Sequence, residues 1–446
     1  MKVGVWCAYG KTLSLTDGIG VFAHCLAKYL AHSPRVNGVV LAIHAGDEEV
    51  VAETVAAGGG KIQSVSLQTL SFTQRWRRKR LRWRHRSLSN RLAMLGCSGE
   101  LGGGPRAERL AAQLNETEAL TAQVLAQQPV STPSVVADPA SGGCDIWVLP
   151  HVSVERAFPS ATLVMIHDMV PLRERGLVKP HDLASFRRRS QAVANRSTLI
   201  GCMSETIRDG DIVGLLGCPA AKVRVVPPAV PDDIGFAGAS DVARSVTAEP
   251  PLPESVKAPY LLYPAAFRSY KNHELLIASL PLLDAQGLPR LQLVFTGEAP
   301  LPKDLAERAA ALGVTDRVVT LGRVDRSVLE QLYRSAAATV VPSRHEQGSF
   351  PVLEALACGC PVAVSDIPSL REAFGPLTRA MPFFDPASPA SFVEAVAGLL
   401  RDPQAARAAQ ATGFRELRGR SWSEAADEWV DVFVEAIRIH EQAATE

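Results

Sequence analysis

Short apolar runs and amphipathic segments alternate regularly from Tyr260 onward, and this constrains the fold more than any other feature of the sequence. The runs have the length of buried strands, and the segments between them repeat their apolar residues at helical spacing. Such alternation builds an α/β fold with a doubly wound parallel sheet, whose ligands lie beyond the carboxyl ends of the strands. We expect strands at 260–263, 291–296, 318–321, 339–341 and 361–364, and helices at 273–283, 304–312, 327–335 and 351–358.

The beginning of the chain has the same pattern. Residues 2–7 predict a buried strand, residues 17–20 a loop with two glycines, and residues 22–30 a helix. A second strand is predicted at 39–43, and strand–helix–strand is the unit of a parallel sheet. Further strands are expected at 146–149, 162–166, 197–202 and 223–226.

The length of 446 residues suggests two or three domains rather than one core. We expect an N-terminal Rossmann-like domain at 1–240, a linker at 241–259 where Pro, Ala and Ser are frequent, and a C-terminal domain at 260–422. Residues 423–446 are predicted to form a last helix that packs back on the N-terminal domain.

Composition excludes several classes of protein. Apolar residues make up 47% and charged residues 21%, as in soluble globular proteins, and the net charge of +1 does not predict a nucleic-acid partner. Of the eight cysteines only Cys358 and Cys360 share a short spacing, which argues against a zinc ribbon or finger. We find neither a signal-peptide pattern nor an apolar run long enough to span a bilayer, and we expect a cytoplasmic protein.

The most informative stretch is 340–361, with the sequence VVPSRHEQGSFPVLEALACGCP. A predicted strand leads into a loop that contains Glu346, Gly348 and Ser349, and a helix begins near Pro351. Proline suits the first turn of a helix, where its missing N–H is not needed. The free N–H groups of that turn can bind an anion or sugar hydroxyls.

Two carboxylates flank this helix start. Glu346 precedes the turn and Glu354 lies one helical turn inside it, so both can reach one elongated ligand. Carboxylates suit sugars because they accept charge-assisted hydrogen bonds from vicinal hydroxyls. Taken alone, the pair would be interpreted as two solvated surface residues.

Two further segments place polar residues at strand ends. Arg268 and Lys271 follow the strand at 260–263, where two fixed cations would neutralise a diphosphate and its developing negative charge. His167 and Asp168 follow the strand at 162–166. A pair of solvated cations and a buried core histidine are the alternatives at these two places.

The stretch 340–361 resembles the signature of the retaining GT-B glycosyltransferases of family four. That signature has a Glu, a glycine–aromatic–glycine turn, a Pro, and a second Glu eight positions after the first. Glu346, Pro351 and Glu354 keep this order and spacing, whereas Gln347–Phe350 replaces the commoner turn with one that has a single glycine.

The resemblance implies two facing Rossmann-like domains with a cleft between them, the donor lying against the C-terminal domain and the acceptor entering over the N-terminal domain. By resemblance, Glu346 contacts the donor sugar and Glu354 the ribose hydroxyls, while the backbone at Gly348, Ser349 and Phe350 contacts the sugar or the diphosphate. The family also implies that no metal is needed.

The family places an Arg and a Lys where Arg268 and Lys271 stand, followed by an Asn as here. Both cations would stabilise the departing diphosphate, and His167 would face the reacting sugar. Smaller signals complete the expected site. They are Gly18 and Gly20 near the diphosphate or acceptor, and Gly297 and Val324 in the nucleotide pocket.

We therefore expect transfer of a hexosyl group, with mannosyl from GDP-mannose as the first candidate, from a nucleotide-diphosphate sugar. The acceptor would be a hydroxyl of a glycan or of a lipid-linked saccharide in bacterial polysaccharide or lipopolysaccharide biosynthesis. A GT-B epimerase or phosphorylase, and a non-catalytic membrane-bound partner of an assembly complex, are the alternatives.

Residues 75–91 hold nine Lys and Arg and no acidic residue. Trp76 and Trp83 share a helical face there, which suits an interfacial helix on anionic lipid at the inner face of the membrane. A solvated charged segment is the main alternative, and nucleic-acid binding is a lesser one. Residues 96–143 are rich in Gly, Ala, Gln and Pro and predict a mobile insertion with one helix near 107–126.

Overall fold

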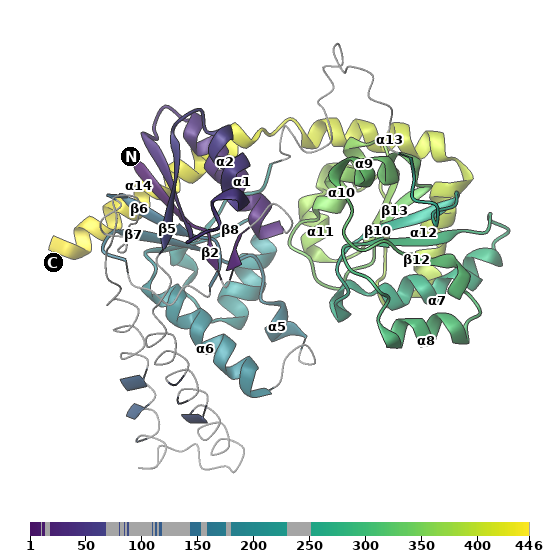
Figure 1. Ribbon diagram of the computed structural model, residues 1–446, viewed down its shortest axis with the longest axis horizontal. Coiled ribbons are helices and arrows are strands. Elements are labelled where there is room, and N and C mark those ends of the chain that lie inside the picture. Colours follow the sequence, from purple (N-terminus) through teal and green to yellow (C-terminus); the bar gives the residue numbers. More distant parts are fainter. Residues whose placement is uncertain are drawn as a thin grey trace. The chain divides into compact units, whose positions relative to one another are not determined.

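The computed structural model describes residues 1–9, 11–13, 18–67, 80, 84, 87–88, 109, 112–113, 116–117, 143–152, 158–174, 180–229 and 251–445. They form two compact units (Figure 1). Unit 1 comprises Met1–Val226 together with Ser423–Glu446, and unit 2 comprises Pro227–Trp422. Among the described residues, no helix is both long enough and apolar enough to cross a membrane.

Unit 1 is built on a seven-stranded sheet with the order β5-β4-β1-β6-β7-β8-β9, in which every neighbouring pair is parallel. The chain moves outward in one direction from β1 to β5 and in the other from β6 to β9, so the order reverses between β1 and β6. The strands are β1 (Lys2–Trp6), β4 (Gly38–His44), β5 (Ile62–Leu67), β6 (Ile146–Leu149), β7 (Ala161–Met165), β8 (Leu199–Cys202) and β9 (Val223–Val225).

The other elements of unit 1 are mostly helical. A small antiparallel pair, β2 (Ala8–Tyr9) with β3 (Lys11–Thr12), follows β1. The helices are α1 (Gly18–His32), α2 (Ala52–Ala57), α5 (Val170–Arg173), α6 (Pro180–Arg196), α14 (Trp422–Thr445) and a π-helix over Ile207–Leu215, with 3-10 turns at Glu48–Val51 and Ala220–Lys222.

The prediction of a loop at 17–20 is wrong at Gly18 and Gly20, which lie in the first turn of α1. The buried apolar face that contains Phe22 and Leu26 extends one turn further toward the N-terminus than the sequence pattern indicates. A glycine costs less at the end of a helix than in its interior, so the pair does not prevent the helix from starting there.

The C-terminal helix α14 packs on the sheet of unit 1. Trp429 lies against Gly201 of β8, where a Cβ atom would come within 2.9 Å of the indole ring. Nearer the end of the helix, the Nε–H of Arg224 donates to Glu435 over 2.8 Å. An aromatic contact and an ion pair thus join the last helix to strands that precede it by more than two hundred residues.

Unit 2 contains a six-stranded parallel sheet with the order β12-β11-β10-β13-β14-β15. This is the common doubly wound order, which reverses between the first strand, β10, and the fourth, β13. The strands are β10 (Tyr260–Pro264), β11 (Gln292–Thr296), β12 (Val318–Thr320), β13 (Ala338–Val341), β14 (Val362–Ser365) and β15 (Phe383–Phe384).

Helices connect these strands, and the inner strands are buried along their length, as expected when helices cover both faces of a parallel sheet. The helices are α7 (His273–Asp284), α8 (Lys303–Ala311), α9 (Arg326–Ser335), α10 (Phe350–Ala357), α11 (Pro368–Ala373), α12 (Pro389–Arg401) and α13 (Pro403–Leu417), with 3-10 turns at Ser269–Lys271, Thr315–Arg317 and Gly375–Leu377.

The strands and helices predicted over 260–364 are present, each with ends within one residue of the prediction. Unit 1 ends at Val226, earlier than the expected domain end at residue 240, and the second break between the units falls between Trp422 and Ser423. The basic segment 75–91 and the insertion 96–143 lie outside the described residues except at a few positions.

Candidate functional site

Two loops of unit 2 meet where its strand order reverses. Residues 265–272 follow β10, and residues 342–349 follow β13. The two strands are paired and parallel, so both loops emerge at the same edge of the sheet. Ligands of doubly wound sheets bind at this place, because the chain leaves the two strands in opposite directions and opens a crevice between the loops.

An ion pair joins the two loops. Lys271 Nζ donates to Glu346 Oε1 over 2.6 Å, and the hydroxyl of Ser343 donates to the same oxygen over 2.7 Å. The Lys271 side chain is 21% exposed and that of Glu346 is 11% exposed. The pair is therefore mostly withdrawn from water, where charge-assisted hydrogen bonds are stronger than at an open surface.

A buried tyrosine supports this pair from the core. The oxygens of Tyr263 and Ser343 are 2.9 Å apart. Because Ser343 uses its only hydrogen toward the Glu346 carboxylate, Tyr263 must be the donor between the two hydroxyls. Burial, and then the charge of Glu346, raise the pKa of Tyr263 well above its ordinary value, so the phenol keeps this proton.

Asn272 fastens the same loops through its amide. It lies in the left-handed region with φ of 59°, which Asn tolerates better than most residues, and it precedes α7. Its Nδ2 donates to the carbonyl of Pro342 over 3.1 Å and to that of Pro386 over 2.8 Å. Its Oδ1 accepts from Arg344 over 3.0 Å. Asn272 thus ties the end of the first loop to the loop after β13 and to Pro386.

Arg268 lies in the same loop and is more exposed than Lys271. Its Nη1 is 3.2 Å and 3.3 Å from the two carboxylate oxygens of Glu298. Glu298 also accepts the N–H of Phe267 over 2.9 Å, and that bond, followed by the charge of Arg268, lowers the pKa of the carboxyl. The guanidinium is 49% exposed and remains accessible to an anionic ligand.

Gly297 allows this approach between the loops after β10 and β11. Its φ of 105° favours glycine, and a Cβ atom there would lie 3.4 Å from the carbonyl carbon of Ala265. Val324, the other residue assigned to a nucleotide pocket, follows β12 and packs half-buried against the core of unit 2.

Glu354 lies on α10 and accepts a hydrogen bond from a side chain of α9. The hydroxyl of Tyr333 donates to its Oε2 over 2.8 Å. Burial raises the pKa of Glu354, while Tyr333 and then Arg326 act in the opposite direction. One oxygen of the carboxylate thus has a fixed donor within the protein, and the other is free of this bond.

Residues 348–350 form the start of α10. Ser349 is the residue before the helix, Phe350 is its first residue, and Pro351 follows within the first turn. No acidic side chain lies in that turn, so its N–H groups carry uncompensated partial positive charge. Space lies open where a Cβ of Gly348 would point, and the backbone there is accessible to a ligand.

The site residues predicted in unit 1 lie at a different sheet edge. His167 follows β7 and makes an edge-to-face ring contact of 5.2 Å with Phe22 of α1. The carboxylate of Asp168 accepts the N–H of Val170, the first residue of α5, over 3.1 Å. His151, which follows the neighbouring strand β6, has its pKa lowered to about 4 by burial and then by the charges of His167 and Arg189.

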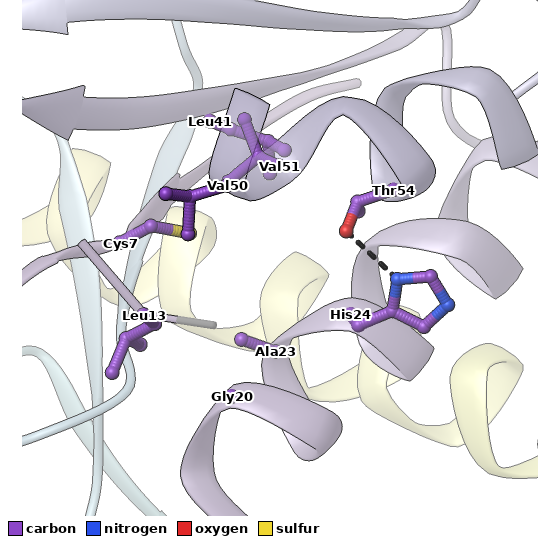
Figure 2. A pocket seen from close by; sticks show the side chains of 9 residues that line it. All are labelled: Cys7, Leu13, Gly20, Ala23, His24, Leu41, Val50, Val51 and Thr54. Atoms are coloured by element: carbon purple, nitrogen blue, oxygen red, sulfur yellow. Dashed lines mark hydrogen bonds between the residues drawn. The ribbon is translucent and has the colours of Figure 1, made fainter. Parts of the chain in front are cut away.

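Gly20 lines a small pocket between α1 and the segment 50–54, with Leu41 of β4 also in its wall (Figure 2). In this pocket His24 Nδ1 lies 2.7 Å from Thr54 Oγ1. Its volume of about 10 Å³ is close to the space that one water molecule needs. Gly18, at the start of the same helix, is exposed.

The structure therefore brings Arg268, Lys271 and Glu346 together at one sheet edge of unit 2. Sequence reasoning missed two side chains that hold this group, namely Tyr263 and Ser343, and it missed Tyr333, which holds Glu354. Tyr263 and Ser343 could have been found, since each is a polar residue at the carboxyl end of a predicted strand. Tyr333 contacts Glu354 from another helix, and no local pattern indicates such a contact.

Comparison with solved structures identifies the architecture. The sucrose-phosphate synthase of Thermosynechococcus elongatus matches with a TM-score of 0.62 at 16% identity, covering 98% of each chain. HepE of Anabaena, solved in complex with UDP and glucose, matches with a TM-score of 0.62 at 14% identity, covering 98% of this chain and 100% of that one. With its two Rossmann-like units, the chain has the GT-B fold of glycosyltransferases.

Sequence comparison finds similar proteins for part of the chain. Residues 247–415 match the family described as glycosyl transferases group 1, which confirms the resemblance seen at 340–361. A D-inositol 3-phosphate glycosyltransferase of Xylanimonas cellulosilytica is 29% identical over 254 residues, or 56% of this chain and 59% of the relative. The chain thus spans less than two thirds of the length of that relative.

Proposed function

We propose that this protein is a glycosyltransferase that moves a hexosyl group from a nucleotide-diphosphate sugar to an acceptor hydroxyl with retention of the anomeric configuration. The family match over 247–415 and the glycosyltransferase names of the relatives support this reaction. The ion pair of Lys271 and Glu346 at the reversal of strand order in unit 2 is the observation that carries the proposal.

The arrangement suits a donor that has a sugar at one end and two phosphates in the middle. Arg268 and Lys271 provide cations from one loop, while Glu346 provides an acceptor for sugar hydroxyls from the other. As the bond between the sugar and the diphosphate breaks, negative charge grows on the leaving phosphate. Cations already fixed in place stabilise that charge without reorganising.

Glu354 is assigned to the ribose. A carboxylate that accepts one bond from Tyr333 still has lone pairs for two neighbouring hydroxyls. The free N–H groups at the start of α10 are assigned to the diphosphate or the sugar, for the reason that helix N-termini bind anions. His167 of unit 1 is assigned to the reacting sugar.

The donor and the acceptor are chosen for testing from two sources. GDP-mannose is the first donor, because the segment Arg268–His273 looks like that of bacterial mannosyltransferases. UDP-glucose is the second, because HepE was solved with UDP and glucose. D-inositol 3-phosphate and a lipid-linked saccharide are the acceptors to compare.

Transfer assays with these donors and acceptors test the proposal, with the anomeric configuration of the product determined by NMR. We expect Lys271→Met and Glu346→Gln each to lower kcat at least a hundredfold, since each removes a fixed charge from the site. Lys303→Met on α8 is the control, because that side chain is 90% exposed and should leave the rate unchanged. Equal rates in the two site variants and the control would refute the assignment.

Each donor is also incubated without an acceptor. A new sugar formed from the donor alone would favour an epimerase. Donor binding without turnover for any acceptor would favour a non-catalytic partner of an assembly complex. Product with inverted configuration would remove retention from the proposal and leave the transfer intact.

A further inference from the structure

One buried carboxylate in unit 1 is bonded to the segment that carries His167. Asp211 lies in the π-helix Ile207–Leu215 and is 1% exposed. Its Oδ2 accepts the backbone N–H of Met169 over 2.7 Å, and its Oδ1 accepts Nε–H of Arg173 over 2.6 Å. Met169 follows His167 by two residues and Arg173 follows it by six.

Both oxygens of this carboxylate are therefore used on one segment. A buried charge is costly unless it is paired and its remaining lone pairs are hydrogen-bonded. Asp211 meets both conditions, because it pairs with the guanidinium of Arg173 in α5 and accepts the backbone N–H of Met169 in the loop after β7. The contact fixes the course of the chain at a carboxyl end of the parallel sheet, where ligands of such sheets bind.

The residue beside the carboxylate makes room for this pair. A Cβ atom on Gly210 would lie 2.5 Å from Arg173 Nη2, which is closer than such atoms can approach. Glycine at this position lets the guanidinium lie directly against the π-helix. Single π-helical turns are uncommon and occur frequently at functional sites.

His167 is also fixed by contacts with α1 and with the sheet of unit 1. The edge of its ring system meets Phe22 of α1 at 5.2 Å between centroids. The backbone before it is part of the sheet, since the N–H of Ile166 donates to Gly201 over 2.9 Å. Asp211 fixes the backbone after it, so His167 lies between two anchored residues.

We propose that Asp211, through Met169 and Arg173, is a positioning residue that holds His167 in its working place. The inference rests on the proposed function, in which His167 faces the reacting sugar. Asp211 touches no substrate in this account. Its effect reaches the reaction only through the position of the imidazole.

Three variants test the inference. Asp211→Asn removes the charge and keeps an oxygen for Met169, Arg173→Lys keeps a cation without the Nε–H, and Gly210→Ala keeps both charges and displaces the guanidinium. Asp209→Asn is the matched control, because Asp209 lies in the same helix, pairs with Arg208 and is 65% exposed. The measurements are the ¹⁵N and ¹H signals of the His167 ring, kcat and the donor KM.

We expect Asp211→Asn and Gly210→Ala to shift the His167 ring signals and to lower kcat roughly ten- to a hundredfold, the loss typical of a misplaced catalytic group. The donor KM should stay within about twofold, because the other side chains assigned to the donor lie in unit 2. Arg173→Lys should lower kcat less than the other two variants, since it keeps a cation beside the carboxylate, and Asp209→Asn should change nothing.

Unshifted ring signals in both folded variants would overturn the inference, and so would an unchanged kcat in both. If Asp211→Asn does not fold, Gly210→Ala and Arg173→Lys supply the same comparison. If the wild-type protein transfers no sugar, the proposed function fails by itself. The ring signals still decide the positioning role in that case, since they require no turnover.

Discussion

The hydroxyl of Tyr333 on α9 donates a hydrogen bond to Oε2 of Glu354 on α10 over 2.8 Å, and Glu354 is the carboxylate assigned to the ribose. The contact opposes the effect of burial, which raises the pKa of Glu354. It also leaves the carboxylate in a fixed orientation. A side chain outside the signature at 340–361 therefore supports one of its two acidic residues.

Tyr333→Phe should raise the pKa of Glu354 further, because the variant removes a donor that favours the charged form. A folded state that holds its proton more tightly than the unfolded state loses stability as pH rises between the two pKa values. The variant should raise the folded-state pKa of Glu354 and so extend this pH range to higher values. A ¹³C NMR titration of the Glu354 carboxyl measures the shift, and a pKa that stays or falls would contradict the role of Tyr333.

Lowering the pH should reduce the stability of unit 2 through the titration of His273. This side chain is 3% exposed, and burial lowers its pKa to about 4 from an ordinary value of 6.5. Between these two pKa values, His273 is protonated in the unfolded chain and neutral in the folded chain. The free energy of unfolding therefore falls as pH drops from about 6.5 toward 4. The full loss would be roughly 3 kcal/mol.

His273→Phe retains a ring among Tyr263, Phe267 and Phe295 and cannot take up a proton. Urea unfolding at pH 7 and at pH 4.5 compares the two proteins. The variant should lose less stability than the wild type between these pH values. An equal loss in both would show that His273 is not a source of the acid sensitivity.

Gly297→Ala should destabilise unit 2 by about 1–3 kcal/mol, because an alanine is strained at φ of 105°. Gly398→Ala is the matched control in α12, where no atom lies within 4 Å of the added Cβ. Replacing a glycine inside a helix with alanine stabilises by about 0.5–1 kcal/mol. Thermal unfolding should show opposite changes in Tm, and changes of the same sign would be evidence against this description of the loop after β11.

Gly201→Ala should weaken the packing of α14 on unit 1. The added carbon would lie 2.6 Å from the sulfur of Met165 and 2.9 Å from the ring of Trp429. Overpacking of this kind costs about 1–3 kcal/mol. Gly38→Ala at the start of β4 is the control, since its Cβ would be 3.6 Å from the nearest atom. Hydrogen exchange should become faster in α14 of the first variant only.

The sequence predicts the architecture because the strands of unit 2 are apolar and separated by helical periodicity over 260–364. It predicts the candidate site where residues at strand ends share a known signature, as Lys271 and Glu346 do. Parallel pairing of β10 and β13 then brings these residues together across 75 positions of the chain.

Other features depend on contacts that no local pattern encodes. The two-residue strand β15 is too short to have a period of its own, and it forms because Phe383 and Phe384 pair with β14. The π-helix at 207–215 has no counterpart among the elements predicted from the sequence. The bond from Tyr333 to Glu354 and the anchoring by Asp211 likewise join residues from separate elements.

Calorimetric titration of UDP, GDP, UDP-glucose and GDP-mannose into the wild type and into the charge swap Lys271→Glu with Glu346→Lys tests the central claim most directly. The swap keeps an ion pair between the two loops, so a purely structural pair would survive it with binding unchanged. We predict that the wild type binds at least one of these ligands and that the folded swap binds it at least tenfold more weakly, which is about 1.4 kcal/mol. Equal affinity in both proteins, or no binding of any of the four by the wild type, would contradict the account.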